Sequence, residues 1–248
     1  AYNELGVVRT LLESPEGATV RKFPEPLEQD FHAYVRQRAL DILGQRWVVL
    51  FLFYAFVGFS TYLQVRQMSY PLFLQGNLDV WWIVYAVEGV AIGGLMLLPH
   101  WSLMRNHYAI STSILAFTAL TSITIATSAF PDPYFNQHSS YVVIFITSIV
   151  YGIGGLSLRV ATLASWSAAF ASLAAIWWFN LWLDWGMYLQ YVMLANFVGM
   201  MLCYVLEMRD RKTFLQARLL ELEKEKLDEV RTKFPFLKDA DQFRILHD

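Results

Sequence analysis

One acidic residue, Glu88, interrupts an otherwise apolar run, "WWIVYAVEGVAIGGLMLL", at 81–98. A carboxyl group at mid-depth in a bilayer is costly unless it is neutral, paired or hydrated, so such groups usually serve a function. Glu88 is therefore our first candidate for ligand binding or proton sensing, and we place Asn196 in the same candidate site. The alternative is a structural carboxyl that is hydrogen-bonded to Asn196 or to a Ser or Thr of the run 109–127.

Six Trp residues gather near one edge of the apolar runs, and two lie near the other edge. Trp81 and Trp82 begin one run, and Trp178 and Trp182 lie at the end of another. An aromatic belt at the membrane interface accounts for such residues. The alternative is an aromatic-walled pocket for a lipid-like or quinone-like ligand, and we include these four Trp in the candidate site.

The sequence carries no catalytic motif: it has no Walker loop, GxSxG, HExxH or CxxC. Its single cysteine, Cys203, lies in an apolar run. His100 and His107 are separated by about 10 Å along a helix, so they do not ligate one haem from opposite sides. We expect no cofactor and no metal site. A haem- or quinone-binding subunit of an electron-transfer complex and a small transporter are kept as alternatives.

The composition is that of a membrane protein. Hydrophobic residues make up 56% of the 248-residue chain and charged residues 16%, whereas soluble domains carry about 25% charged residues. The net charge of −2 leaves no basic surface to neutralise phosphates, which argues against a nucleic-acid partner.

A bilayer span needs about 20 mostly apolar residues, and six runs approach that length. The fourth and fifth are separated only by the residues 157–159, which predicts a tight connection. The fold class that we predict is thus an all-α membrane protein with a six-helix transmembrane bundle. The predicted spans are 47–65, 81–98, 109–127, 141–156, 160–182 and 188–206.

The fifth run carries small residues at helical spacing, and the second run contains a GxxxG at Gly89 and Gly93. Small side chains let membrane helices approach one another closely. We therefore expect a compact bundle in which these positions face neighbouring helices. The small residues of the fifth run are Ala161, Ser165, Ala168, Ala169 and Ser172.

The distribution of positive charge predicts the orientation. Eighteen of the nineteen Lys and Arg residues fall on one side of the six runs, and only Arg66 falls on the other. Loops rich in Lys and Arg stay in the cytoplasm. We therefore predict a multi-pass protein of the inner (cell) membrane with both termini cytoplasmic. Because the outer loops are short, a stimulus is expected to act within the bilayer or at its outer edge.

The last apolar run passes without a Gly or Pro into a charged segment, 207–234, so one helix is predicted to continue through both. Its leucines are spaced four and three apart, which is typical of a coiled-coil seam. A second apolar set, which includes Leu227, lies on a shifted face. We predict a cytoplasmic coiled coil that joins two copies in a parallel homodimer and can switch between two arrangements. The signalling-helix residues are Leu215, Leu219, Leu222 and Leu227.

The stretch "RDRKTFLQARLLELEKEKL" resembles the juxtamembrane helix that follows the six-span domains of bacterial class III adenylate cyclases. Related membrane domains precede diguanylate cyclases and histidine kinases. The stretches "FHAYVRQRALDILGQRWVVLFLFYAFVGFSTYL" and "YGIGGLSLRVATLASWSAAF" are similar to parts of the same receptors. The resemblance implies a sensor that regulates a cytoplasmic output domain in cis or in trans. The aromatic residues at the outer edge make a membrane lipid or lipid-like molecule the expected ligand.

Four regions follow from these patterns. Residues 1–46 form a cytoplasmic segment whose amphipathic helix, from 27, lies on the inner leaflet or clasps the signalling helix. Residues 47–206 form the transmembrane domain, and 207–234 form the signalling helix. Residues 235–248 are expected to begin a truncated or unresolved output region. The expected function is regulation of a signalling enzyme, for which a nucleotide cyclase is the best candidate.

Overall fold

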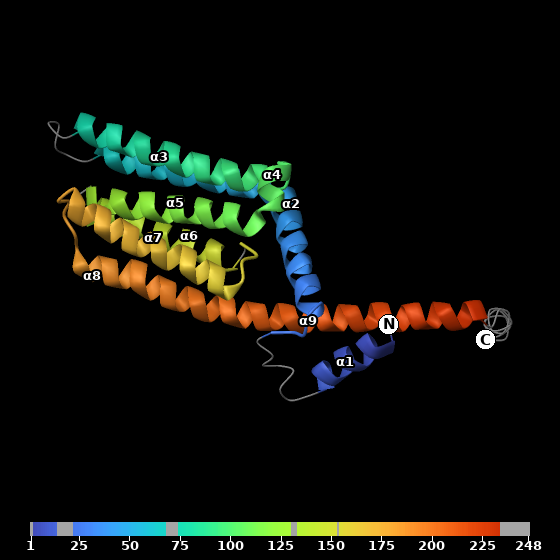
Figure 1. The fold of residues 1–248 in the computed structure, drawn as a ribbon. Helices are drawn as coiled ribbons and strands as arrows, with labels where there is room; N and C mark the ends of the chain where they lie inside the picture. Colours follow the sequence, from blue (N-terminus) through green and yellow to red (C-terminus); the bar gives the residue numbers. More distant parts are fainter. Residues whose placement is uncertain (1, 14–21, 68–73, 130–132, 153, 234–248) are drawn as a thin grey trace, which may run out of the picture. The chain divides into compact units, whose positions relative to one another are not determined.

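The computed structural model describes residues 2–13, 22–67, 74–129, 133–152 and 154–233. Every regular element in these ranges is a helix (Figure 1). The predicted output region at 235–248 lies outside the described residues. The helices are α1 Tyr2–Glu13, α2 Leu27–Gln67, α3 Leu74–Leu97, α4 Ser102–Asn106, α5 Tyr108–Ala129, α6 Pro133–Gly152, α7 Leu158–Trp178, α8 Trp185–Met187, the π-helical η2 Tyr188–Met193, and α9 Leu194–Lys233.

Four helical stretches are long and apolar enough to cross a membrane. They are Leu27–Leu63, Tyr108–Ser128, Leu158–Trp178 and the continuous run Trp185–Lys233. Two shorter apolar stretches, at the second and fourth predicted spans, are Trp81–Leu97 and Ser140–Gly152. The prediction of an all-helical membrane protein is therefore confirmed at this level.

The chain divides into two compact units. One comprises Ala1–His32 with Met208–Asp248, and the other comprises Ala33–Glu207. The predicted division at 46 coincides instead with a bend in α2, where Arg46 has non-helical dihedral angles (φ −112°, ψ 15°).

In the unit Ala33–Glu207, α5 is the central helix. It packs against α3, α6 and α7, and Figure 1 shows it between α3 and α7. The residues around it belong to one buried cluster that also takes in Ala39 and Leu40 from the first part of α2. Ser and Thr side chains of α5 bond to carbonyls of their own helix, as Thr124 does to Leu120 O at 2.6 Å. Such bonds let part of the Thr-rich run be buried, although the buried Thr121 hydroxyl has no hydrogen-bond partner among the described residues.

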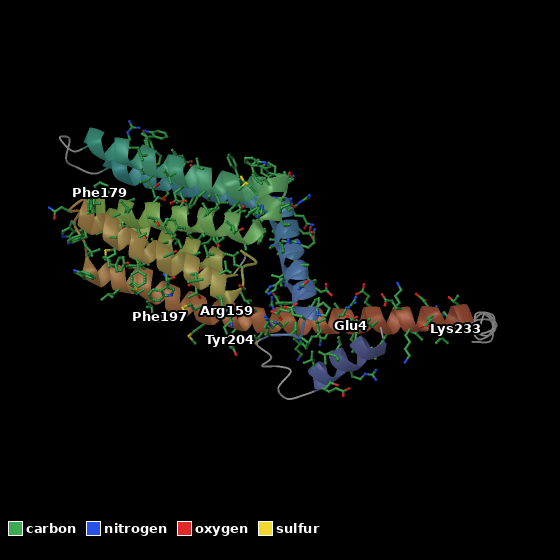
Figure 2. All side chains as sticks on the ribbon, in the orientation of Figure 1. Glu4, Arg159, Phe179, Phe197, Tyr204 and Lys233 are labelled. Atoms are coloured by element: carbon green, nitrogen blue, oxygen red, sulfur yellow. The ribbon has the colours of Figure 1, made fainter. Side chains whose placement is uncertain are left out.

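Helix α7 buries small side chains and exposes large ones. All five of the predicted small residues are buried, whereas Leu163 is 72% and Phe170 57% exposed. Figure 2 shows side chains such as those of Phe197 and Tyr204 on the outer side of α9, and Phe197 is 56% exposed. Apolar residues on the outside and small residues at helix contacts are the pattern of a lipid-facing bundle.

The connection between α6 and α7 depends on Gly155. Its φ of +57° lies in the left-handed region, and a Cβ added there would lie 2.5 Å from the Cβ of Ala39. Tyr108 OH donates a hydrogen bond to the neighbouring Gly154 O at 2.5 Å. The connection thus begins before the predicted residues 157–159, because the chain leaves α6 at Gly152.

The first turn of α7 is capped from another helix. Glu207 Oε2 accepts a hydrogen bond from Leu158 N at 3.0 Å. The first backbone N–H groups of a helix lack partners within it, and a carboxylate there also suits the helix dipole. Glu207 therefore joins the start of α7 to α9.

Gly155→Ala should lower the free energy of unfolding by about 1–3 kcal/mol, because a side chain there meets both an unfavourable φ and Ala39. Thermal unfolding in mild detergent measures the effect. Gly93→Ala is the matched control, since a Cβ at Gly93 meets nothing within 4 Å. An unfolding midpoint of Gly155→Ala equal to that of the wild type would contradict this account of the connection.

Candidate functional site

A hollow beside Glu88 lies between four helices of the unit Ala33–Glu207. The empty volume between its walls is about 690 Å³, a figure that includes space open to the surroundings. Its walls are apolar and aromatic apart from Glu88 and Thr61 and the Tyr hydroxyls. We call it the Glu88 hollow. Its lining residues are Phe53, Tyr54, Val57, Gly58 and Thr61 from α2; Trp81, Val84, Tyr85, Glu88 and Ile92 from α3; Ile123 and Ala126 from α5; and Val142, Phe145, Ile146 and Ile149 from α6.

The Glu88 carboxyl is buried and has a hydrogen-bond partner on α5. The residue is 8% exposed, and Ser122 Oγ donates a hydrogen bond of 2.6 Å to its Oε1. The partner thus comes from the run 109–127, one of the two sources that the sequence left open. Asn196 lies elsewhere: its Oδ1 accepts a bond from Tyr151 OH at 3.2 Å, and its Nδ2 donates to Val192 O.

Three aromatic rings form a stack along one wall of the hollow. The rings of Trp81 and Tyr85 are 4.9 Å apart and nearly parallel, and those of Tyr85 and Tyr54 are 4.5 Å apart. Tyr54 OH donates to Tyr85 O at 2.7 Å, and Trp81 Nε1 donates to Thr61 Oγ1 at 3.0 Å. The polar ends of these side chains are thus bonded between α2 and α3, while their rings line the wall.

Two glycines make room for this stack. A Cβ at Gly58 would lie 2.0 Å from the Tyr85 ring, and a Cβ at Gly89 would lie 2.6 Å from Tyr54 OH. Of the predicted GxxxG, Gly89 contacts another helix as expected, whereas Gly93 has nothing within 4 Å of an added Cβ and does not serve as a packing position. The contact is with a tyrosine ring rather than with a second glycine-lined helix surface.

The four predicted Trp residues do not line one pocket. Trp81 lines the Glu88 hollow, and Trp82 is 54% exposed while its ring contacts those of Trp81 and Tyr85. Trp182 lines a different, smaller hollow of about 360 Å³. Trp178 lines neither and is 78% exposed, as an interfacial residue would be.

Several residues of the hollow were missed from the sequence. Tyr85 had a usable signal, because 81, 85 and 88 share one face of a helix. Tyr54 and Phe145 had none, since each comes from another helix and is otherwise an ordinary residue of an apolar run. Among the described residues, no group of three or more His, Cys, Asp or Glu side chains could hold a metal ion.

The other unit contains a second arrangement of charged groups. Arg211 of α9 donates two hydrogen bonds of 2.8 Å to the two oxygens of Glu28 at the start of α2. Phe23 N donates a further bond to Glu28 Oε2 at 2.6 Å. The guanidinium lies over the rings of Phe23 and Phe31, 4.9 and 4.5 Å from their centroids. Both charged side chains are almost fully buried.

Two surface ion pairs extend this contact along α9. Glu4 of α1 accepts a bond from Arg218 at 2.8 Å, and Arg9 pairs with Glu223 at 3.0 Å. Figure 2 labels Glu4 on α1. Exposed pairs of this kind contribute about 0–1 kcal/mol, so the buried Glu28–Arg211 pair dominates. We call the contacts of residues 2–13 and 22–32 with α9 the clasp.

Glu28 is held in its ionised form. Burial alone would raise its pKa, but the hydrogen bonds from Arg211 and from Phe23 N, together with the Arg211 charge, hold the pKa below its usual value. His32 Nε2 lies 3.3 Å from Glu28 Oε1 and also favours the carboxylate. The pair is therefore fully charged near neutral pH.

The predicted coiled-coil leucines divide into two sets. Leu215 and Leu222 are buried within the single chain, and Leu219 is partly buried. Phe214, next to Leu215, packs on the rings of Phe23 and Phe31. Leu227 is 61% exposed. The chain thus covers the first part of the predicted seam itself. For the start of α2, the clasp is favoured over a helix lying on the leaflet.

Comparison of this chain with protein-family models, with characterised proteins and with solved structures finds no match.

Acidification should release the clasp. A carboxyl with a lowered pKa stabilises the folded state above its ordinary pKa of about 4.3, and this contribution is lost as the pH falls through the lowered value. Amide hydrogen exchange of α1, measured from about pH 7 to about pH 3 and corrected for the intrinsic rate, should therefore lose protection at the acidic end. In the Glu28→Gln variant, the amides of α1 should be weakly protected from exchange over the whole pH range. Unchanged protection of the wild type down to the lowest pH would contradict the role of Glu28.

Proposed function

We propose that this chain is the membrane-embedded sensor and dimerisation part of a signalling protein. It crosses the membrane six times with both termini in the cytoplasm, and it regulates a cytoplasmic enzyme, for which a class III nucleotide cyclase is the best candidate. The observation that carries the proposal is the Glu88 hollow: a buried carboxyl in an aromatic-walled space within a helical bundle. Intramembrane carboxyl groups commonly mark ligand or proton sites.

A continuous set of contacts leads from this hollow to the signalling helix. Glu88 is bonded to Ser122 on α5, and α5 packs against α7. The first turn of α7 is bonded to Glu207 on α9. A ligand that moves α3 against α5 therefore has a packed route by which to shift α9, since cores change between discrete arrangements rather than deform smoothly.

The output end requires two alternative states of α9. Leu215 and Leu222 are needed for the predicted dimer seam, yet the clasp covers them in the single chain. The N-terminal segment and the α9 of a second copy then compete for one face of the helix. A stimulus that shifts α9 changes the balance between the clasped helix and the coiled-coil dimer, and the dimer brings two catalytic domains together.

Support for a cyclase as the regulated enzyme comes from the resemblance of residues 27–230 to the membrane domains of class III adenylate cyclases. In those proteins the catalytic domain follows the juxtamembrane helix. The unbroken α9, Leu194–Lys233, is suited to such a connection, because a helix transmits rotation or translation better than a loop does.

Glu88→Gln should change the response of this sensor without preventing folding, because the side chain keeps its shape and loses its charge. The assay fuses the full chain to a class III cyclase domain and measures cyclic AMP across a panel of lipid-like compounds and external pH. Asp184→Asn is the matched control: Asp184 lies outside the hollow, accepts a bond from Met187 N, and Asn keeps this capping role. Identical responses of Glu88→Gln and the wild type to every stimulus would rule out the sensory role.

Cysteines at 215 and 222 should form few disulfides between chains in the wild type, and many when the clasp is broken by Arg211→Met. Removing one partner of a buried ion pair costs about 3–5 kcal/mol, which is enough to release the segment. Oxidative crosslinking in native membranes, with Cys203 replaced by Ala, measures this. A cysteine at Leu227, which is exposed in the clasped chain, reports dimer formation at a position that the clasp does not cover, and its crosslinking should also rise in Arg211→Met. Equal crosslinking at 215 with and without Arg211 would contradict the competition.

A further inference from the structure

We propose that the Glu88 hollow binds a lipophilic ammonium ion: a molecule with one cationic amine and an apolar body. This inference deepens the sensor proposal by naming the class of ligand, and it rests on that proposal for its role in signalling. The binding itself is tested independently of any output.

The first argument is the incomplete hydrogen bonding of the Glu88 carboxyl group. Its Oε1 is bonded to Ser122, whereas its Oε2 has no hydrogen-bond partner among the described residues. None of the residues that line the hollow is Lys, Arg or His. An ionised carboxyl at this position therefore needs a positive partner, and in a medium of low dielectric constant a cation close to it is strongly attracted.

Three other polar groups of the hollow already have hydrogen-bond partners: those of Tyr54, Thr61 and Trp81. Tyr54 OH donates to Tyr85 O, and Thr61 Oγ1 donates to carbonyls of its own helix while accepting from Trp81. A ligand that needs several hydrogen bonds, such as a sugar or a nucleotide, would find few here. A ligand in the hollow would therefore be held mainly by one ionic contact with Glu88.

The aromatic stack provides the second argument. Trp81, Tyr85 and Tyr54 stand one after another beside the carboxyl, with their rings lining the space. Aromatic faces attract cations through their quadrupole. Because Trp81 and Tyr54 cover both faces of the Tyr85 ring, only the outer faces of Trp81 and Tyr54 are open to a cation. A carboxylate with adjacent aromatic rings favours an ammonium head group and disfavours an anion such as a fatty acid.

The remaining walls suit an alkyl or ring body. Val57, Val84 and Ile92 lie on the side of α2 and α3, and Ile123 and Ile146 lie on the side of α5 and α6. Large apolar side chains on the same helices, such as Phe56 and Val90, are exposed, as lipid-facing residues are. A ligand that already partitions into the bilayer can therefore enter from the side with its head group directed towards Glu88.

The test measures binding of dodecylammonium to the full chain in lipid nanodiscs by calorimetry, with empty nanodiscs subtracted. Dodecanol, a neutral probe of the same chain length, is measured beside it. The wild type should bind dodecylammonium at least about tenfold more tightly than dodecanol, and Glu88→Gln should remove this preference. Glu88→Asp, which keeps the charge, should retain part of it, and Asp184→Asn should leave it unchanged.

Equal binding of the two probes by the wild type, or equal dodecylammonium binding by Glu88→Gln and the wild type, would overturn the proposal. If Glu88→Gln does not fold, Ile92→Trp replaces it: this variant keeps the carboxyl and fills the hollow, and it should lose the binding. Retained binding in Ile92→Trp would place the amine outside the hollow and also overturn the proposal.

The two proposals fail in different ways. One outcome is that dodecylammonium binding depends on Glu88 while the Glu88→Gln fusion and the wild-type fusion give the same cyclic AMP response. This result would support the binding site and refute its sensory role. The opposite outcome is that Glu88→Gln changes the cyclic AMP response of the fusion while the wild-type chain binds dodecylammonium and dodecanol equally well. This result would refute the ammonium ligand alone.

Discussion

Close contact between helices is the constraint on which the bundle depends. In a bilayer, moving an apolar side chain from lipid into the protein gains little, so helices associate through packing of small residues and a few polar bonds. The buried face of α7, with Ala161, Ala168 and Ser172, meets this requirement, while large side chains such as Leu163 face outward. Gly155, Gly58 and Gly89 serve the same need where a backbone meets a ring or another helix.

Within this tightly packed bundle, the Glu88 hollow is a departure. The space beside the Trp81–Tyr85–Tyr54 stack is left open, and a carboxyl is placed next to it with one oxygen bonded to Ser122. A purely structural carboxyl would be expected to have both oxygens bonded by neighbouring helices. The combination of an open space and an incompletely bonded carboxyl is what connects the architecture to a sensory role.

Different forces act on the clasp. There, Glu28 and Arg211 form a two-bond ion pair enclosed by Phe23, Phe31 and Phe214. Such a pair is not a strong source of stability relative to apolar packing, but breaking it leaves a buried charge without a partner. This favours an all-or-none contact, which suits a segment that is either docked on α9 or released from it.

The sequence by itself determined the helical membrane class, the small-residue face of α7, the unusual position of Glu88 and the continuity of α9. These features depend on residue type and on spacing along one helix, so they can be predicted from the local sequence of that helix. The bend at Arg46 also falls where composition changes from charged to apolar.

Only the tertiary structure decided which side chains meet. It paired Glu88 with Ser122 rather than Asn196, separated Trp182 from Trp81, and joined Glu28 to Arg211 across 183 residues of sequence. Each of these outcomes depends on the rotation of one helix about its axis relative to another. Helical periodicity defines the faces of a helix, but the partner of each face is set by the packing of the whole chain.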